Sequence, residues 1–177
     1  MSDPSLALTA HEQEIIAQQL GREPLGIMAI VAKSGDIPLV LRMRSWLHDA
    51  PFPTLFWLCS KDLHTAINKI ETAGFVKQLE AEIADNPSLK QAVLADQAHY
   101  VQLRENYMLA EDKASIEKAA LSDTFATFGI GGIKHWDKVR CLHMHYAFHL
   151  ALKEQGGSAI GRILDARFAL EKTVIQR

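Results

Sequence analysis

The chain has few cysteines, with only Cys59 and Cys141 among its 177 residues. Two cysteines so far apart do not make the disulfide framework of a small secreted protein, and we expect free thiols in a reducing cytoplasm. The N-terminus lacks the basic start and apolar core of a signal peptide. No apolar run approaches the roughly 20 residues that span a bilayer. We therefore expect a cytoplasmic protein that does not associate with membranes.

Strong charge of either sign is also missing, since the formal net charge is -2. This balance excludes the broad positive surface of most nucleic-acid-binding proteins, although it leaves room for a local basic pocket. The chain is 48% hydrophobic and 23% charged, which is ordinary for a soluble globular protein. Its length predicts a single domain over residues 1–177 with a substantial core. A protein partner or a homo-oligomer is left open.

The pattern along the chain predicts an α+β fold, in which several helices cover a small antiparallel sheet. Residues 26–33 and 37–44 are short apolar runs around a glycine turn and predict a hairpin. A third apolar run, residues 54–59, predicts another strand. Thr9 and Glu12 form the sequence signature of a capping box at the start of the first helix. Further helices are predicted at residues 61–73, 75–84, 86–109 and 160–171, with a loop at 122–135.

The most informative stretch is residues 129–149, which holds a glycine loop, Arg140, Cys141 and four histidines. We predict a buried helix over residues 137–154. At roughly 100° per residue, His143 lies on one side of this helix. Cys141, His145 and His149 lie on the opposite side, and because both sides also carry apolar residues the helix is expected to be central.

A metal site is one interpretation of that helix. Cys141, His145 and His149 are spaced one turn apart, and thiolate and imidazole are preferred ligands of zinc. Zinc or iron would need a further ligand from elsewhere, for which the candidates are Cys59, His48 and His99. The alternative is a set of hydrogen-bonded core histidines beside a small buried thiol. Cys141 as a nucleophile with His145 as its base is disfavoured by a buried position on the helix.

An anion site is the second interpretation. Gly129, Gly131 and Gly132 precede the predicted helix, and glycines allow backbone amides to point at an anion near a helix N-terminus. Arg140 follows closely in the sequence. The loop matches neither a P-loop nor a dinucleotide-binding fingerprint. The alternative is a tight loop that simply requires positive φ.

Three other arginines bear on the anion site. Arg42 and Arg44 alternate along a predicted strand and therefore face the same side, and Arg22 joins them if the chain folds back. Such a pair more commonly forms a solvated face. If the arginines bind a phosphate-bearing small molecule through bidentate hydrogen bonds, His143 or His145 is the candidate proton carrier. Whether such a protein is an enzyme or a sensor stays open.

Several blocks together resemble a known family. They are Leu20–Pro24, Pro51–Leu58, Gly129–Gly132 and Val139–His143, in this order. The chain resembles the bacterial domain-of-unknown-function family 501. The resemblance implies a compact cytoplasmic bacterial protein and supplies no established activity.

The chain also departs from the pattern of that family. Its members often have Thr-Cys-Pro where this chain has Cys59-Ser60-Lys61, so a cysteine is displaced by one residue. On a strand this displacement points Cys59 to the other face, which argues against a site shared by Cys59 and Cys141. Ala159 likewise replaces a proline expected before Ile160.

Three functions follow from the residues. The first is binding of, or action on, an anionic phosphate-bearing small molecule through the glycine loop and the arginines. The second is a metal-binding protein that uses Cys141, His145 and His149. The third is a non-catalytic interaction module, with the predicted helix over residues 86–109 as its partner surface.

Overall fold

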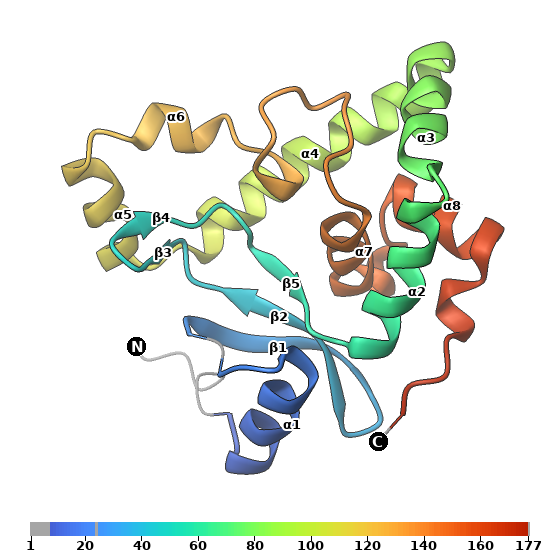
Figure 1. Cartoon of the computed structure of the whole chain (residues 1–177). Helices are drawn as coiled ribbons and strands as arrows, with labels where there is room; N and C mark the ends of the chain where they lie inside the picture. The colour runs from blue at the N-terminus through green and yellow to red at the C-terminus, as the bar shows by residue number, and fades with distance from the viewer. Residues whose placement is uncertain (1–7, 24, 177) are drawn as a thin grey trace.

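A three-stranded antiparallel sheet lies at the centre of the computed structural model, which describes residues 8–23 and 25–176 (Figure 1). The strands are β1 (Ile27–Ser34), β2 (Ile37–Met43) and β5 (Phe56–Leu58), in the order β1-β2-β5. The predicted sheet is confirmed, and its third strand is shorter than residues 54–59. Between β2 and β5, the short strands β3 (Trp46–Leu47) and β4 (Ala50–Pro51) form a separate two-stranded ribbon.

Eight α-helices surround the described part of the sheet. They are α1 (Ala10–Leu20), α2 (Lys61–Thr72), α3 (Phe75–Asp85), α4 (Pro87–Tyr107), α5 (Ala110–Lys118), α6 (Ser122–Ala126), α7 (Leu142–Ala151) and α8 (Ala159–Phe168). Single 3-10 turns lie at Ile130–Gly132, Lys153–Gln155 and Leu170–Lys172. In the described part of the chain, no helix combines the length and apolar character needed to cross a membrane.

The helices divide between the two faces of the sheet. Helix α1 packs on one face, where its Ile16 is fully buried against Leu41 and Met43. The capping box predicted for α1 is confirmed, because Thr9 and Glu12 bond each other's backbone N–H groups. The other helices lie on the opposite side (Figure 1), and the larger core cluster is there.

Helix α7 is the central helix, as predicted, and packs against β5, α8 and α2. The predicted bounds of 137–154 are wrong, because the helix runs only from Leu142 to Ala151. Cys141 precedes it in an extended conformation, with φ -153° and ψ 119°. Glu80 accepts a hydrogen bond from the Val139 amide, and Glu71 accepts one from the Leu142 amide. These side chains hold the segment outside the helix.

One smaller expectation needs correction, and the helix considered as a partner surface can be placed in the fold. The predicted loop over residues 122–135 contains the short helix α6 and a 3-10 turn. Helix α4, considered above as a partner surface, buries Val93, Gln97, Tyr100 and Arg104 in the fold. It therefore serves as a core helix on that side, and it extends across the molecule from α3 to the ribbon of β3 and β4 (Figure 1).

Candidate metal centre

The structure does not bring Arg22 and Arg42 into one pocket. The Arg22 guanidinium lies 5.4 Å from the centre of the Trp57 ring. Trp57 pairs with Leu41 across the sheet, whereas Arg42 pairs with Phe56. Because paired residues share a face and neighbours alternate, Trp57 and Arg42 lie on opposite faces of the sheet. The two arginines are therefore separated by the sheet itself.

Arg44 is engaged by acidic residues of α5. Its Nε lies 3.1 Å from Oδ1 of Asp112, and its Nη2 pairs with both Asp112 and Glu111. Asp112 is only 1% exposed and also accepts a hydrogen bond of 3.0 Å from the Ser45 amide. Two carboxylates compensate the charge of Arg44, so its contacts hold α5 against the end of β2.

The glycine loop uses its own amides within the protein. The Ile130 amide donates to Oε1 of the buried Gln97 at 2.6 Å, and the Gly132 amide donates to the Gly129 carbonyl at 3.0 Å. A Cβ atom on Gly129 would lie 2.2 Å from that Gln97 oxygen. Gly131 and Gly132 have φ values of 74° and 73°. These observations support a tight loop packed on Gln97. Arg140 is exposed beside it, with Nη1 3.5 Å from the Gly131 carbonyl.

His149 has a structural environment. Its Nδ1 accepts a hydrogen bond from the Ser158 amide at 2.9 Å, which leaves the proton on Nε2 to be donated to Asp165 at 3.0 Å. A Cβ atom on Gly157 or Gly161 would lie within 2.3 Å of this imidazole. With both nitrogens bonded and both sides enclosed, the ring has no nitrogen left for a metal ion.

Neither His145 nor Cys59 belongs to a group of described residues with metal-binding geometry. His145 is 2% exposed, and its Nε2 has no hydrogen-bond partner within the described chain. Burial lowers the pKa of His145 from 6.5 to about 4, so the ring is neutral at ordinary pH. Cys59 packs with the α1-side cluster, and its thiol contacts the Pro38 carbonyl at 3.3 Å. Burial raises the pKa of Cys59 to about 12.

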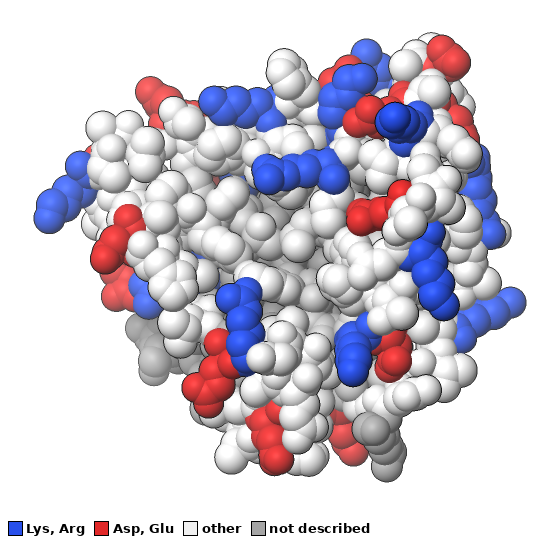
Figure 2. All heavy atoms as spheres, viewed as in Figure 1, with Lys and Arg blue, Asp and Glu red and all other residues white. Residues whose placement is uncertain are grey.

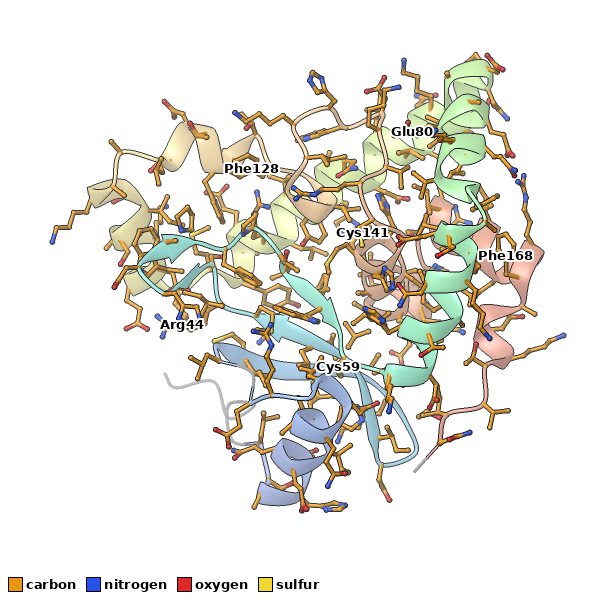
Figure 3. All side chains as sticks on the ribbon, viewed as in Figure 1. Arg44, Cys59, Glu80, Phe128, Cys141 and Phe168 are labelled. Carbon is orange, nitrogen blue, oxygen red and sulfur yellow. The ribbon has the colours of Figure 1, made fainter. Side chains whose placement is uncertain are left out.

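A different set of three residues does converge. Among the described residues, the group with metal-binding geometry is Glu71, Cys141 and His143, whose candidate ligand atoms all lie within 4.8 Å of one another. Glu71 comes from α2 and His143 from the first turn of α7, and Cys141 immediately precedes that helix. Figure 3 labels Cys141. Nδ1 of His143 lies 3.4 Å from Sγ of Cys141 and 3.4 Å from Oε1 of Glu71. The predicted partners His145 and His149 are not in this set.

The orientation of the His143 ring distinguishes a metal site from a nucleophile. The carboxylate and the thiol both face Nδ1, while Nε2 lies 3.3 Å from the His64 carbonyl. In a catalytic triad, the acid and the nucleophile contact opposite nitrogens of the imidazole. Burial also raises the pKa of the Cys141 thiol, whereas reactive cysteines have lowered values. The arrangement therefore favours ligands that converge on one ion.

The distances agree with tetrahedral zinc. Zinc bonds of about 2.0–2.3 Å to nitrogen, oxygen and sulfur place neighbouring ligand atoms about 3.4–3.6 Å apart. The two distances of 3.4 Å that involve Nδ1 of His143 match this spacing. Nε2, which donates to a backbone carbonyl, matches the way proteins orient metal-ligating histidines. Glu71 also accepts the Leu142 amide at 2.7 Å, so it fixes the first turn of α7.

The centre is accessible from one side of the molecule. His143 is buried, whereas Glu71 and Cys141 are partly exposed. Cys141 lies toward the middle of the view in Figure 3, and in the same view Figure 2 shows a surface hollowed near its centre. Lys and Arg side chains stand at separate points around this hollow. Because Glu71 and Cys141 are partly exposed, an ion can reach the carboxylate and the thiol from solvent.

His64 lies next to the three residues. Its ring centre is 4.3 Å from that of His143, and its Nδ1 is 3.0 Å from Nδ2 of Asn68. Burial and the neighbouring His143 lower the pKa of His64. The sequence interpretation did not include His64 or Glu71. Their spacing of seven residues, about two turns on one face of α2, was the available signal.

Comparison with known proteins identifies a family. No curated protein and no solved structure matches the chain. The model of a family described as "Protein of unknown function (DUF501)" matches residues 31–166, which include Glu71, Cys141 and His143. This span is well over half of the 177 residues and confirms the resemblance drawn from the four sequence blocks. The chain therefore belongs to the DUF501 family.

Proposed function

We propose that the protein binds a zinc ion through Oε1 of Glu71, Sγ of Cys141 and Nδ1 of His143. The observation that carries the proposal is the convergence of these three atoms, with both neighbours of the His143 Nδ1 at 3.4 Å. Carboxylate, thiolate and imidazole all belong to the ordinary zinc ligand set. The thiolate and the carboxylate balance the charge of a divalent ion, so the centre becomes neutral on binding.

Metal binding would link two parts of the fold. Glu71 lies at the end of α2, and Cys141 lies in the extended segment just before α7. An ion shared by them ties the central helix of the core to α2. Because binding requires the thiol to lose its proton, affinity should rise with pH. Zinc should also stabilise the folded chain, since the unfolded chain does not hold the three ligands together.

The first experiment measures zinc in protein purified without chelators. We expect about one zinc per chain in the natural protein and its loss in Cys141→Ser. Cys59→Ala is the matched control, because Cys59 is a buried thiol on the other side of the sheet. Absence of zinc from the natural protein, together with no binding on titration with zinc or Co²⁺, would overturn the proposal.

A pair of glutamate variants separates metal binding from helix capping. Glu71 accepts a hydrogen bond of 2.7 Å from the Leu142 amide at the start of α7, and Glu80 accepts one of 2.8 Å from the Val139 amide just before it. Replacing either residue with Gln retains an oxygen acceptor and removes the charge. We expect Glu71→Gln to lower zinc affinity and Glu80→Gln to leave it unchanged. Equal affinities in the two variants would show that Glu71 only caps the helix.

A further inference from the structure

We propose that Nε2 of His64 is the fourth ligand, which closes the coordination sphere around the ion bound by Glu71, Cys141 and His143. This inference rests on the proposed function and extends it, because it decides what kind of centre is formed. A zinc ion with three protein ligands keeps a position for water and substrate, whereas four protein ligands make a structural centre. The fourth ligand therefore separates a catalytic site from a metal-dependent clamp.

The position of His64 in the fold supports its role. His64 and Glu71 are seven residues apart in α2 and share one face of that helix. The His64 carbonyl accepts the hydrogen bond from Nε2 of His143 at 3.3 Å, and the two rings lie 4.3 Å apart with a tilt of 39°. The imidazole of His64 thus lies directly beside a ligand of the ion.

The hydrogen bonding of His64 leaves the required nitrogen available. Nδ1 has a partner in Nδ2 of Asn68 at 3.0 Å, and within the described chain no hydrogen bond is formed by Nε2. Rotation of the Asn68 amide would present its oxygen to Nδ1–H and leave the lone pair on Nε2. A metal-ligating histidine is commonly held in this way by a hydrogen bond to its other nitrogen. Both side chains are exposed, so the ring can turn toward the ion without disturbing the core.

Charge and geometry favour imidazole in this position. The thiolate of Cys141 and the carboxylate of Glu71 already balance the two positive charges of zinc, and a neutral ring adds none. Zinc in structural centres is almost always tetrahedral with four protein ligands. The completed set would contain two ligands from α2 and two from the segment that begins α7. Such a centre acts as a clamp between these elements.

The test compares the natural protein with His64→Ala. Zinc affinity is measured by competition with a chelator, and coordination is followed from the visible spectrum of bound Co²⁺. We expect a tetrahedral spectrum in the natural protein. We expect affinity to fall roughly tenfold or more in His64→Ala, with added imidazole restoring the tetrahedral spectrum. His11→Ala, which removes an exposed histidine of α1, is the matched control and should bind like the natural protein.

The outcomes separate the two proposals. If the natural protein binds neither zinc nor Co²⁺, the metal centre itself is wrong and the role of His64 is wrong with it. If the natural protein binds metal and His64→Ala has the same affinity and the same Co²⁺ spectrum, only the fourth ligand is wrong, and a solvent molecule occupies that position. A thermal unfolding curve of metal-free His64→Ala that matches the natural protein excludes a folding defect as the cause of weaker binding.

Discussion

The buried His145 should make the stability of this protein depend on pH in a way that one substitution removes. His145 lies on α7 with 2% exposure and an Nε2 that has no hydrogen-bond partner within the described chain. Burial lowers its pKa from 6.5 to about 4 in the folded protein. Between pH values equal to these two pKa values, His145 therefore binds a proton in the unfolded chain but not in the folded chain. The contribution of His145 to the free energy of unfolding is fully retained above the unfolded-state pKa of 6.5. It is lost as the pH falls toward the folded-state pKa of about 4.

The size of the effect follows from the two pKa values. At 1.36 kcal/mol per pH unit, the full difference in folding free energy is about 3 kcal/mol. About 2 kcal/mol of it should already be lost at about pH 5, where the unfolded imidazole is mostly protonated and the folded one is mostly neutral. His145→Leu has no proton to bind at this position, so its stability should lack this component.

Urea unfolding at neutral pH and at about pH 5 measures the effect, with the loss between the two conditions compared across variants. The loss should be about 2 kcal/mol larger in the natural protein than in His145→Leu. His11→Leu, which changes an exposed histidine of α1, should keep the pH dependence of the natural protein. If His145→Leu loses as much stability as the natural protein, the ring is not held neutral by burial and the reasoning fails.

Two further predictions concern packing. Gly161→Ala should cost about 1–3 kcal/mol by urea unfolding, because the new Cβ would lie 2.0 Å from the His149 ring. The cost should shrink in a His149→Ala background, and an equal cost in both backgrounds would refute this contact as its cause. Arg104 is 2% exposed and donates to two backbone carbonyls, so Arg104→Met should cost about 2–4 kcal/mol. The exposed Arg140→Met is its control in thermal unfolding, and a similar small change in both variants would contradict the prediction.

The parts of the fold that could be predicted are those specified by neighbouring residues. The capping box of Thr9 and Glu12 and the hairpin of β1 and β2 each depend on a short segment, and both are present. The start of α7 depends on distant residues. Glu80 and Glu71 hold the amides of Val139 and Leu142 from 59 and 71 residues away. Residues 137–141 carry no local signal of those contacts, so the predicted helix began too early.

The roles of the glycines could not be predicted from the sequence for a related reason. A missing Cβ allows close approach, but the sequence does not say whether a ligand or a side chain of the protein approaches. At Gly129 the approaching group is the buried Gln97, and at Gly161 it is the His149 ring. Both neighbours lie in other elements of the fold, and His149 was itself considered as a metal ligand. At these two positions glycine therefore marks internal packing, and at Gly129 it does so within a segment that resembles a binding loop.

The ligand set of the candidate centre follows from the same displacement of the helix start. If Cys141 belonged to the helix, its thiol would lie on the side of His145, one turn further along. Cys141 has an extended conformation and lies just before the first turn of α7. Its thiol therefore contacts the ring of His143, two residues later. Glu71 then completes the set from α2, since the carboxylate that holds the Leu142 amide is the one that reaches Nδ1 of His143. The contact that stops the helix and the contact that builds the centre are made by a single carboxylate oxygen. A change at Glu71 should therefore alter metal binding and the start of α7 together, and the comparison with Glu80 separates these two effects.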